Sequence, residues 1–428
     1  MENMVTTTVT HHQPSCRHCA TPLNLIVADL GQTPIANDYL DREALTAPEP
    51  KYPLCAYVCS SCRLVQLEDF IRPGDVFSPD YAYQSSMSDS WLEHARHYAG
   101  LMTKKMDLGS DSHVVEIASN DGYLLQYFKA AGISVTGIEP ASYVACIARE
   151  QHGIPTLETF FGESEARTLR TSIGPADLMI ANNVLAHVPK IDDFVAGFRE
   201  LLKPDGIATF EFPHLLNLLE FCQFDTIYHE HFSYLSLMSL EPIFALAHLK
   251  VFDAEELPTH GGSLRLYVAH NASEFHETSR LKQLRVKEFQ AGLDTDAPYL
   301  AFSSKVARVK QELLNLLHEL KAKGKTIAAY GAPAKGNTLL NYCAIGRELI
   351  DFTVDRAPSK QGKYLPGSHI PILSPNAIAE RQPDYLLILP WNLKTEITKQ
   401  FAFIKDWGGH FIVPIPTPAI LCGSGNGD

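Results

Sequence analysis

Short apolar runs alternate with stretches of helical spacing through the middle of the chain. The apolar runs have the length and composition of buried strands, and they lie at 114–119, 134–140, 176–184, 207–213 and 263–270. Between them, residues 121–132 and 191–206 carry apolar positions at helical spacing, and the second stretch stops at a glycine. Strands that alternate with helices predict βαβ units and a parallel sheet, so the fold class is α/β.

A second, smaller α/β unit is predicted towards the C-terminus. Residues 277–323 are charged and helical in pattern, which predicts one or two connecting helices. The alternation then resumes, with a loop entering a helix at 332–343 and strands at 325–331, 349–355, 384–390 and 410–416. Residues 1–85 differ, because they hold five of the nine cysteines and many prolines without a long helical period. The pattern therefore predicts three domains, at 1–85, 86–275 and 276–428.

Composition and charge narrow the class of protein. The 428 residues are 45% hydrophobic and 20% charged, as in globular proteins with substantial cores. No apolar run approaches the ~18 residues of a membrane span, and residues 1–15 lack the basic and apolar regions of a signal peptide. We therefore expect a cytoplasmic protein that does not contact a membrane. A net charge of −13 repels phosphate backbones, which argues against a nucleic-acid partner.

Two C-x2-C pairs of the same spacing lie in the first domain. Cys16 and Cys19 form one pair, and Cys59 and Cys62 form the other. Each pair can place two thiolates on one tetrahedral metal, so the four cysteines together complete the coordination of a zinc ion. Because a closed site leaves no position for substrate, we expect a structural zinc, which suits a small module with little core.

The first predicted strand of the middle domain leads into a candidate cofactor loop. The segment 116–122, EIASNDG, follows a strand and opens a helix, where a doubly wound sheet binds its cofactor. Glu139 closes the next strand and is expected to bind ribose hydroxyls. The pattern G-x-G-x-x-G is absent, and Glu116 and Asp121 would repel a pyrophosphate. Both suit a cofactor with a cationic amino-acid end, which points to S-adenosylmethionine.

The run 228–234, YHEHFSY, concentrates titratable side chains. A histidine acts as a general base near neutral pH, Glu230 could order a network, and Tyr228 could donate to a developing oxyanion. Two other interpretations remain open: a metal site, although a third ligand and H-E-x-x-H are lacking, and an aromatic turn with satisfied histidines. His187 follows a predicted strand end at the ligand-bearing edge of the sheet.

Together these segments resemble the S-adenosylmethionine-dependent sugar C-methyltransferases, which act on nucleotide-linked 4-keto-deoxysugars. The resemblance runs nearly end to end, through the cysteine pairs followed by CRLVQL, then YAYQSS, VVEIASNDGYLL, NNVLAHV, IYHEHFSYLS, HGGSLRLYV, YGAPAKGNTLLNY and VDRAPSKQGKYLPGSHIPI. The departure is Ala118, where the family usually carries glycine. The resemblance implies a zinc-binding module, a Rossmann-like methyltransferase domain and a second Rossmann-like domain at the C-terminus.

The resemblance also implies the reaction and the roles of individual residues. His231 removes the proton from C3 of the sugar, Tyr228 and Glu230 support it, and the resulting carbanion attacks the methyl group of the cofactor. His187 and a tyrosine, Tyr83 in preference to Tyr81, face the substrate. Cofactor binding is assigned to Glu116, Ala118, Asn120, Asp121, Glu139 and Asn182, and substrate binding to Lys335, Asn337 and Tyr81. The expected substrate is a nucleotide-linked 4-keto sugar, on thymidine diphosphate in preference to guanosine diphosphate, and one structural zinc is implied.

Three alternatives belong to other classes. An oxygen- or nitrogen-directed methyltransferase could use the same fold, but it would need the His-Glu-His run less. A zinc-ribbon enzyme directed at RNA would present basic residues around the cysteines, where acidic residues instead outnumber basic ones. A scaffold without catalysis would leave the density of titratable groups at 228–234 without a purpose.

Overall fold

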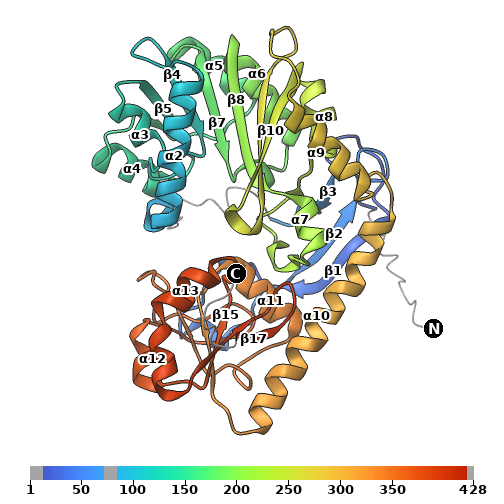
Figure 1. Cartoon of the computed structure of the whole chain (residues 1–428), viewed down its shortest axis with the longest axis vertical. Coiled ribbons are helices and arrows are strands. Elements are labelled where there is room, and N and C mark those ends of the chain that lie inside the picture. Colours follow the sequence, from blue (N-terminus) through green and yellow to red (C-terminus); the bar gives the residue numbers. More distant parts are fainter. Residues whose placement is uncertain (1–12, 72–83, 422–428) are drawn as a thin grey trace, which may run out of the picture.

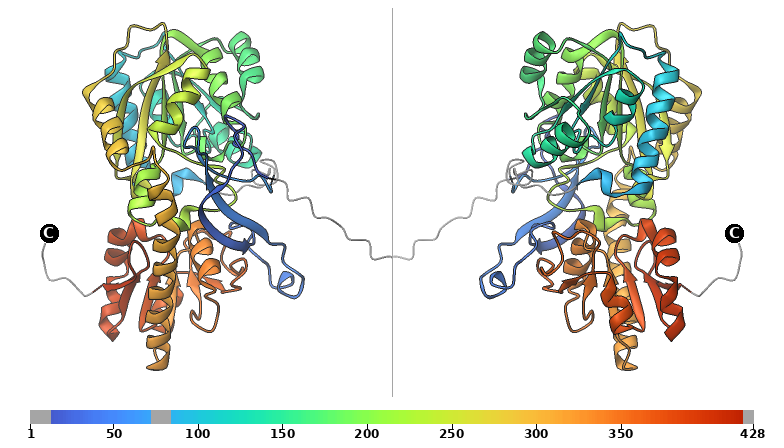
Figure 2. Two further views of the ribbon diagram at one scale, coloured as in Figure 1. Left: turned by 90° about the vertical axis from the view of Figure 1, so that its right-hand side faces the viewer. Right: turned by 90° about the vertical axis from the view of Figure 1, so that its left-hand side faces the viewer.

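The computed structural model describes residues 13–71 and 84–421, and within these ranges the strands form three sheets. The sheet of the middle domain occupies the upper half of the molecule in Figure 1, and the C-terminal sheet occupies the lower half. The N-terminal sheet lies between them on one side, where both neighbours contact it (Figures 1 and 2). Across the described ranges, no helix is long and apolar enough to span a bilayer.

The N-terminal part is an antiparallel sheet in the order β1-β2-β3-β9. Along β2 the buried positions Leu54, Ala56 and Val58 alternate with partly exposed ones, as in a strand with one covered face. The last strand comes from the middle domain, because Val65 pairs with Tyr234. The bounds are β1 (Leu25–Thr33), β2 (Tyr52–Val58), β3 (Val65–Leu67) and β9 (Ser233–Tyr234).

The middle domain has the strand order β10-β11-β8-β7-β4-β5-β6. Side chains of α2, α3 and α4 form the core on one face, and those of α5, α6, α8 and α9 form it on the other. The strands are β4 (His113–Ile117), β5 (Ser134–Ile138), β6 (Thr156–Leu157), β7 (Ala176–Asn182), β8 (Leu202–Pro213), β10 (Leu249–Leu257) and β11 (Ser263–His270). The helices are α2 (Asp89–Lys105), α3 (Leu125–Ala130), α4 (Ser142–Gln151), α5 (Glu163–Ser172), α6 (Ile191–Leu201), α7 (Leu215–Glu220), α8 (Leu237–Leu246) and α9 (Ser279–Gln290).

The α/β class is confirmed, but three details of the pattern are wrong. The helix expected from residue 121 begins at Leu125, because the preceding loop is left-handed at Ala118, Asn120 and Gly122. The helix expected over 191–206 ends at Leu201, and the chain continues directly as β8. Finally, β11 runs antiparallel to its neighbours β8 and β10, while β8 is parallel to β7 as expected; apolar periodicity carries no information on strand direction.

The C-terminal sheet has the order β14-β13-β12-β15-β16-β17 and is parallel except at β17. This arrangement is the second Rossmann-like unit that the sequence predicted. Its strands are β12 (Ile327–Tyr330), β13 (Thr353–Val354), β14 (Ile372–Leu373), β15 (Tyr385–Ile388), β16 (His410–Val413) and β17 (Ala419–Leu421). Its helices are α11 (Ala334–Cys343), α12 (Asn376–Arg381) and α13 (Lys394–Gln400), and α10 (Ala297–Ala322) leads into it.

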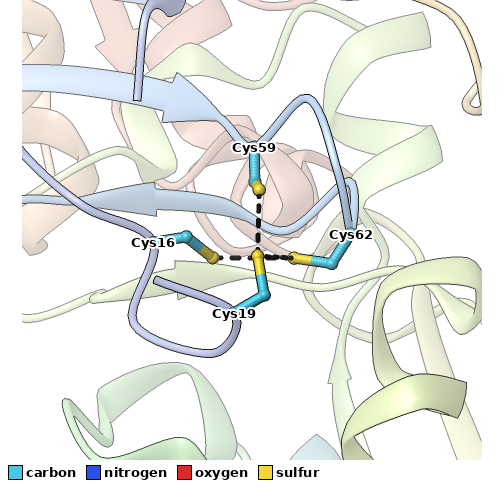
Figure 3. Close-up of side chains that lie close together, drawn as sticks. All are labelled: Cys16, Cys19, Cys59 and Cys62. Carbon is cyan, nitrogen blue, oxygen red and sulfur yellow. Dashed lines mark hydrogen bonds between the residues drawn. The ribbon is translucent and has the colours of Figure 1, made fainter. Parts of the chain in front are cut away.

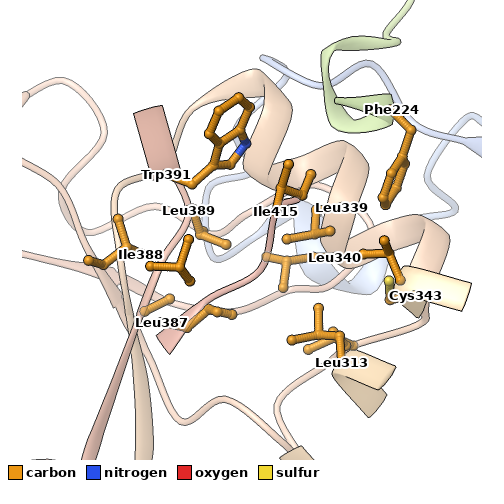
Figure 4. Close-up of a cluster of buried hydrophobic side chains, with 14 of the residues drawn as sticks. Phe224, Leu313, Leu339, Leu340, Cys343, Leu387, Ile388, Leu389, Trp391 and Ile415 are labelled. Atoms are coloured by element: carbon orange, nitrogen blue, oxygen red, sulfur yellow. The ribbon is translucent and has the colours of Figure 1, made fainter. Parts of the chain in front are cut away.

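One continuous core joins the N-terminal sheet to the C-terminal unit. Phe224, from the middle domain, packs beside Leu340 and Cys343 of α11 (Figure 4). The long helix α10 runs down along β1, and the Ser303 hydroxyl donates to the Val27 carbonyl at 2.8 Å (Figure 1). The three sheets are therefore fixed against one another, and residues from all of them can build one site.

Candidate functional site

A cavity of about 740 Å³ lies where the three parts of the chain meet. It opens at the carboxyl ends of β4, β5 and β7, where a doubly wound sheet places its ligands. Nine of the predicted site residues line it: Ala118, Asn120, Glu139, Asn182, His187, Tyr228, Glu230, His231 and Lys335. Three others, Glu116, Asp121 and Asn337, lie behind its wall, while Tyr81 and Tyr83 fall outside the described residues.

Glu139 at the end of β5 is held by two backbone N–H groups. One carboxylate oxygen accepts from Asn120 N at 3.0 Å, and the other accepts from Ala141 N at 2.9 Å. Burial is the larger influence and raises the pKa of Glu139, although these bonds lower it. Since each oxygen keeps a further lone pair, the fixed carboxylate can accept from ribose hydroxyls in the cavity.

Polar side chains of the loop after β4 hold this loop in place. Asp121 accepts from Ser86 N at 3.1 Å, and Asn120 accepts from Ser85 N at 2.8 Å through its side-chain oxygen. Glu116 is fully buried, and this burial raises its pKa well above the usual range. The structure thus gives Glu116 and Asp121 a supporting position rather than one on the cavity surface.

Ala118 has a left-handed backbone, with φ at 57°. A side chain in this conformation costs roughly 1–2 kcal/mol, and glycine adopts it without that cost. The left-handed backbone therefore explains why the family usually has glycine at this position. Alanine keeps the same turn but lowers the stability of the fold.

His231 occupies the centre of the cavity wall with both ring nitrogens engaged. Its Nδ1 donates to the Thr226 carbonyl at 2.9 Å, because a carbonyl can only accept. The neutral ring therefore presents a lone pair at Nε2, to which the Tyr228 hydroxyl donates at 2.7 Å. Burial lowers the pKa of His231 well below its usual range, and the neighbouring His187 lowers it further. At neutral pH the ring is thus an unprotonated acceptor.

His187 lies next to this ring, with the two imidazole centroids 4.6 Å apart at an angle of 75°. Burial lowers the pKa of His187 to about 4, and a hydrogen bond with the backbone of Glu230 partly offsets the effect. Glu230 is itself buried in the wall, and the loss of solvent raises its pKa to about 7. Asn37, from the N-terminal domain, donates to the Glu230 carboxylate at 2.8 Å.

Lys335 brings positive charge to the cavity from the first turn of α11. Its ammonium donates to the Asn392 side-chain oxygen at 2.7 Å and lies 4.8 Å from the Trp391 ring centroid. Burial lowers the pKa of Lys335, and the nearby Asp225 carboxyl opposes this shift. Asn337, two residues further on, donates to the Ala36 carbonyl and holds the N-terminal domain against α11.

The four cysteines converge on one point outside this cavity (Figure 3). Their sulfurs all lie within 4.8 Å of one another, and the Cys16–Cys62 and Cys19–Cys59 pairs are 3.5 and 3.4 Å apart. A tetrahedron with metal–sulfur bonds of about 2.3 Å has sulfurs about 3.8 Å apart. In both pairs the residue after the second cysteine is left-handed, as Ala20 and Arg63 show. The donor set therefore fits a tetrahedral zinc ion.

Family models match this chain in three consecutive segments. They are a putative zinc binding domain at residues 16–77, a methyltransferase domain at 91–253 and a C-methyltransferase C-terminal domain at 258–416. The chain is also 37% identical to the C-methyltransferase NovU of Streptomyces niveus over 406 residues, which cover 95% of this chain and 96% of that protein. This chain belongs to the S-adenosylmethionine-dependent C-methyltransferases. The predicted family and type of enzyme are confirmed.

Solved structures resemble parts of this C-methyltransferase. A methyltransferase from Anabaena variabilis is 13% identical, with a TM-score of 0.37, over 48% of this chain and 99% of that one. The magnesium protoporphyrin IX methyltransferase of Synechocystis PCC 6803, with bound S-adenosylmethionine, is 12% identical, with a TM-score of 0.33, over 42% of this chain and 79% of that one.

Several polar residues that line the cavity of the C-methyltransferase were not predicted, among them Asn37, Asn183, His260 and Lys360. They come from different domains, and no spacing rule connects them to one another or to His231. Lys360 donates to the Ala332 carbonyl at 2.9 Å and lies 4.9 Å from the Tyr39 ring centroid. Lys360 could have been suspected from the sequence, because it is a charged residue within the segment VDRAPSKQGKYLPGSHIPI that carries the family resemblance.

Proposed function

We propose that this C-methyltransferase methylates C3 of a nucleotide-diphosphate-linked 4-keto-deoxysugar through an enolate. The observation that carries the proposal is the neutral His231 ring, whose unprotonated Nε2 accepts from the Tyr228 hydroxyl in a cavity that Lys335 also lines. A base and a cationic wall in one cavity match a substrate that has an acidic C–H group at one end and a diphosphate at the other. Thymidine diphosphate is our first choice of carrier.

Two lysines support the binding of the diphosphate. Lys335 lies in the first turn of α11, a helix of 10 residues whose N-terminus lines the cavity. A helix N-terminus offers backbone N–H groups and the positive end of the helix dipole to an anion. Lys360 reaches the same cavity from the loop after β13. Two cationic side chains and one helix N-terminus suit the charge of a diphosphate, and the sugar would then extend towards His231.

The base step follows from the tautomer of His231. The Tyr228 hydroxyl must first turn away from Nε2, which frees the lone pair. Nε2 then takes the C3 proton, and the electron pair of the broken C–H bond forms the C3–C4 double bond while the carbonyl electrons move to the C4 oxygen. The rotated Tyr228 hydroxyl can donate to the new oxyanion, as can His187.

S-adenosylmethionine, bound against Glu139, supplies an electrophilic methyl group to the carbon nucleophile. Glu139 orients the ribose, while Asn120 and Asp121 keep the loop after β4 in place through their bonds to Ser85 and Ser86. Removal of the proton creates one negative charge, and methyl transfer consumes it, so the proton on His231 is the product that must leave to solvent.

We also propose that the four cysteines hold one structural zinc. Two of the cysteines are buried and two are half-buried, the two turns match, and Gln66 donates to the Cys16 sulfur at 3.2 Å, which together support a closed site. A metal here would fix the ends of the sheet that carries Asn37. Its contribution to catalysis would therefore be indirect.

The test is methylation of a panel of nucleotide-linked 4-keto sugars, with the methyl position determined by NMR of the product. His231→Asn keeps the approximate shape but presents a weaker base, and we expect methylation to fall roughly 10²–10⁴-fold. His229→Asn is the matched control, because His229 points away from the cavity and hydrogen-bonds the Pro53 carbonyl at 3.1 Å.

Methyl on C3 with loss only in the His231 variant supports the proposal. Methyl on an oxygen or nitrogen would assign a different nucleophile and refute it. Full activity of His231→Asn combined with an inactive His229→Asn would move the base two residues along the chain.

A further inference from the structure

His260 enters the cavity on a backbone that a histidine rarely adopts. Its φ is 55°, and Gly261 and Gly262 follow with φ of 93° and 115°, so three successive residues have positive φ. Strain of this kind persists only where the surroundings enforce it, and it is concentrated at functional sites. The two glycines let the turn pack tightly: a Cβ at Gly261 would lie 2.7 Å from the Trp391 ring, and one at Gly262 would lie 2.2 Å from Asn217.

The turn is fixed from two sides. The Gln223 side chain donates to the Gly261 carbonyl at 2.7 Å, and His214 N donates to the Gly262 carbonyl at 3.0 Å. Trp391, which packs against Gly261, belongs to the C-terminal unit. The position of His260 therefore depends on the closed arrangement of the middle and C-terminal domains.

Asn183 sets the tautomer of His260. The Asn183 amide nitrogen lies 3.2 Å from Nε2, and because an amide NH₂ group can only donate, Nε2 accepts. The proton of the neutral ring is then on Nδ1, for which the structure shows no hydrogen-bond partner among residues 13–71 and 84–421. Burial lowers the pKa of His260 to about 4, and Lys335 lowers it further, so the ring is neutral at pH 7.

His260 lies among the groups assigned to both substrates. Its ring meets the Trp91 ring edge-on at 5.1 Å between centroids, and Trp91 stacks on Tyr123 beside the cofactor loop. Lys335 and His231 line the same cavity, and each lies within electrostatic range of His260. A donor at this position therefore shares one cavity with the proposed base and with the loop assigned to the cofactor.

We propose that His260 is a further catalytic residue, whose Nδ1–H donates a hydrogen bond to the C4 oxygen while the enolate forms. This assignment rests on the proposed function. No proton is transferred from His260: the C3 proton goes to His231, and the Nδ1–H stabilises the negative charge left on oxygen. Asn183 is the positioning residue that keeps the proton on Nδ1.

The test compares His260→Ala and His260→Asn in methylation and in exchange of the C3 proton with heavy water. Loss of one preorganised donor to an oxyanion lowers kcat by roughly 10²–10³-fold, and we expect His260→Ala to lose both reactions by this factor. Asparagine tolerates a left-handed backbone and carries an amide N–H near the position of Nδ1, so His260→Asn should recover at least tenfold over alanine.

His248→Ala is the control for the backbone. His248 has the same left-handed conformation, with φ at 57°, but it is exposed at the turn before β10 and does not line the cavity. It should keep wild-type rates. Calorimetry with S-adenosylmethionine should give His260→Ala nearly wild-type affinity, which a misfolded variant would not show.

Two failures can be told apart. If the wild-type enzyme exchanges no C3 proton on any 4-keto nucleotide sugar, the proposed function has failed and the assignment of His260 fails with it. If the wild type exchanges and methylates but His260→Ala does so at a similar rate, or if alanine and asparagine are equally impaired, only the assignment of His260 is overturned.

Discussion

Replacing Glu230 with glutamine should make the stability of this enzyme less dependent on pH. Glu230 is 3% exposed, and burial raises its pKa from 4.5 to about 7, although Asn37 and Lys360 favour the charged form. Glutamine has nearly the same shape, has no charge to bury and can still accept from Asn37. The variant therefore isolates the ionisation of one buried carboxyl group.

The sign and the magnitude follow from the two pKa values. Below pH 4.5 the carboxyl is protonated in both the folded and the unfolded chain, so its ionisation has no effect on the free energy of unfolding. Between pH 4.5 and pH 7 the unfolded chain ionises this carboxyl while the folded protein keeps it protonated, so the free energy of unfolding falls as the pH rises. Above pH 7 the carboxyl is ionised in both states and the loss is complete. A pKa raised from 4.5 to about 7 corresponds to about 3 kcal/mol, of which about 2.5 kcal/mol is lost between pH 5 and pH 8.

The measurement is the Tm of Glu230→Gln minus that of the wild type at intervals from pH 5 to pH 8. An unfolding entropy of about 2.1 cal/mol/K per residue gives about 1 °C per kcal/mol for 428 residues, so this difference should rise by about 3 °C in favour of glutamine towards pH 8. Glu220→Gln, at an exposed position at the end of α7, should show a difference that does not change with pH. A pH-independent difference for Glu230→Gln would refute the buried-carboxyl reasoning, as would a change in the opposite direction.

Three further predictions concern the metal, the cofactor and the turn at His260. Elemental analysis should find about one zinc per chain in wild-type protein and much less in Cys16→Ser, and metal-free wild-type protein purified without chelators would contradict this. Glu139→Ala should weaken S-adenosylmethionine binding in calorimetry by about 1–3 kcal/mol, and unchanged affinity would contradict the ribose contact. Gly262→Ala should lower the Tm by several degrees because its Cβ meets Asn217 at a φ of 115°, whereas Gly109→Ala, with open space around it, should not; equal Tm values would contradict the close approach.

Local patterns predicted the elements that dominate the fold. The apolar runs that became β4, β5 and β7 are short and buried on both faces, so their composition alone marks them as strands of a parallel sheet. The N-terminal strands escaped because their burial alternates within a segment rich in proline and cysteine. The strand β10 was not predicted, and β11, predicted as part of a parallel sheet, runs antiparallel to it because the chain reverses at the turn at 258–262, which periodicity does not reveal.

The candidate site could be predicted only where its residues are close in sequence. Tyr228, Glu230 and His231 are close neighbours in the sequence, and all three line the cavity, as their proximity suggested. Asn37 and Lys360 are more than a hundred residues from that run, and only the packing of three sheets brings them to it. Spacing rules cannot anticipate such contacts, because they depend on domain arrangement.

The most direct test of the central claim is exchange of the C3 proton in heavy water with S-adenosylhomocysteine in place of the methyl donor. If His231 removes that proton before methyl transfer, wild-type enzyme should replace it with deuterium in a 4-keto nucleotide sugar, and NMR should show the C3 signal disappear. His231→Asn should slow the exchange roughly 10²–10⁴-fold, whereas His229→Asn should not. Undiminished exchange by the His231 variant, or none by a wild-type enzyme that methylates the same sugar, would contradict the account.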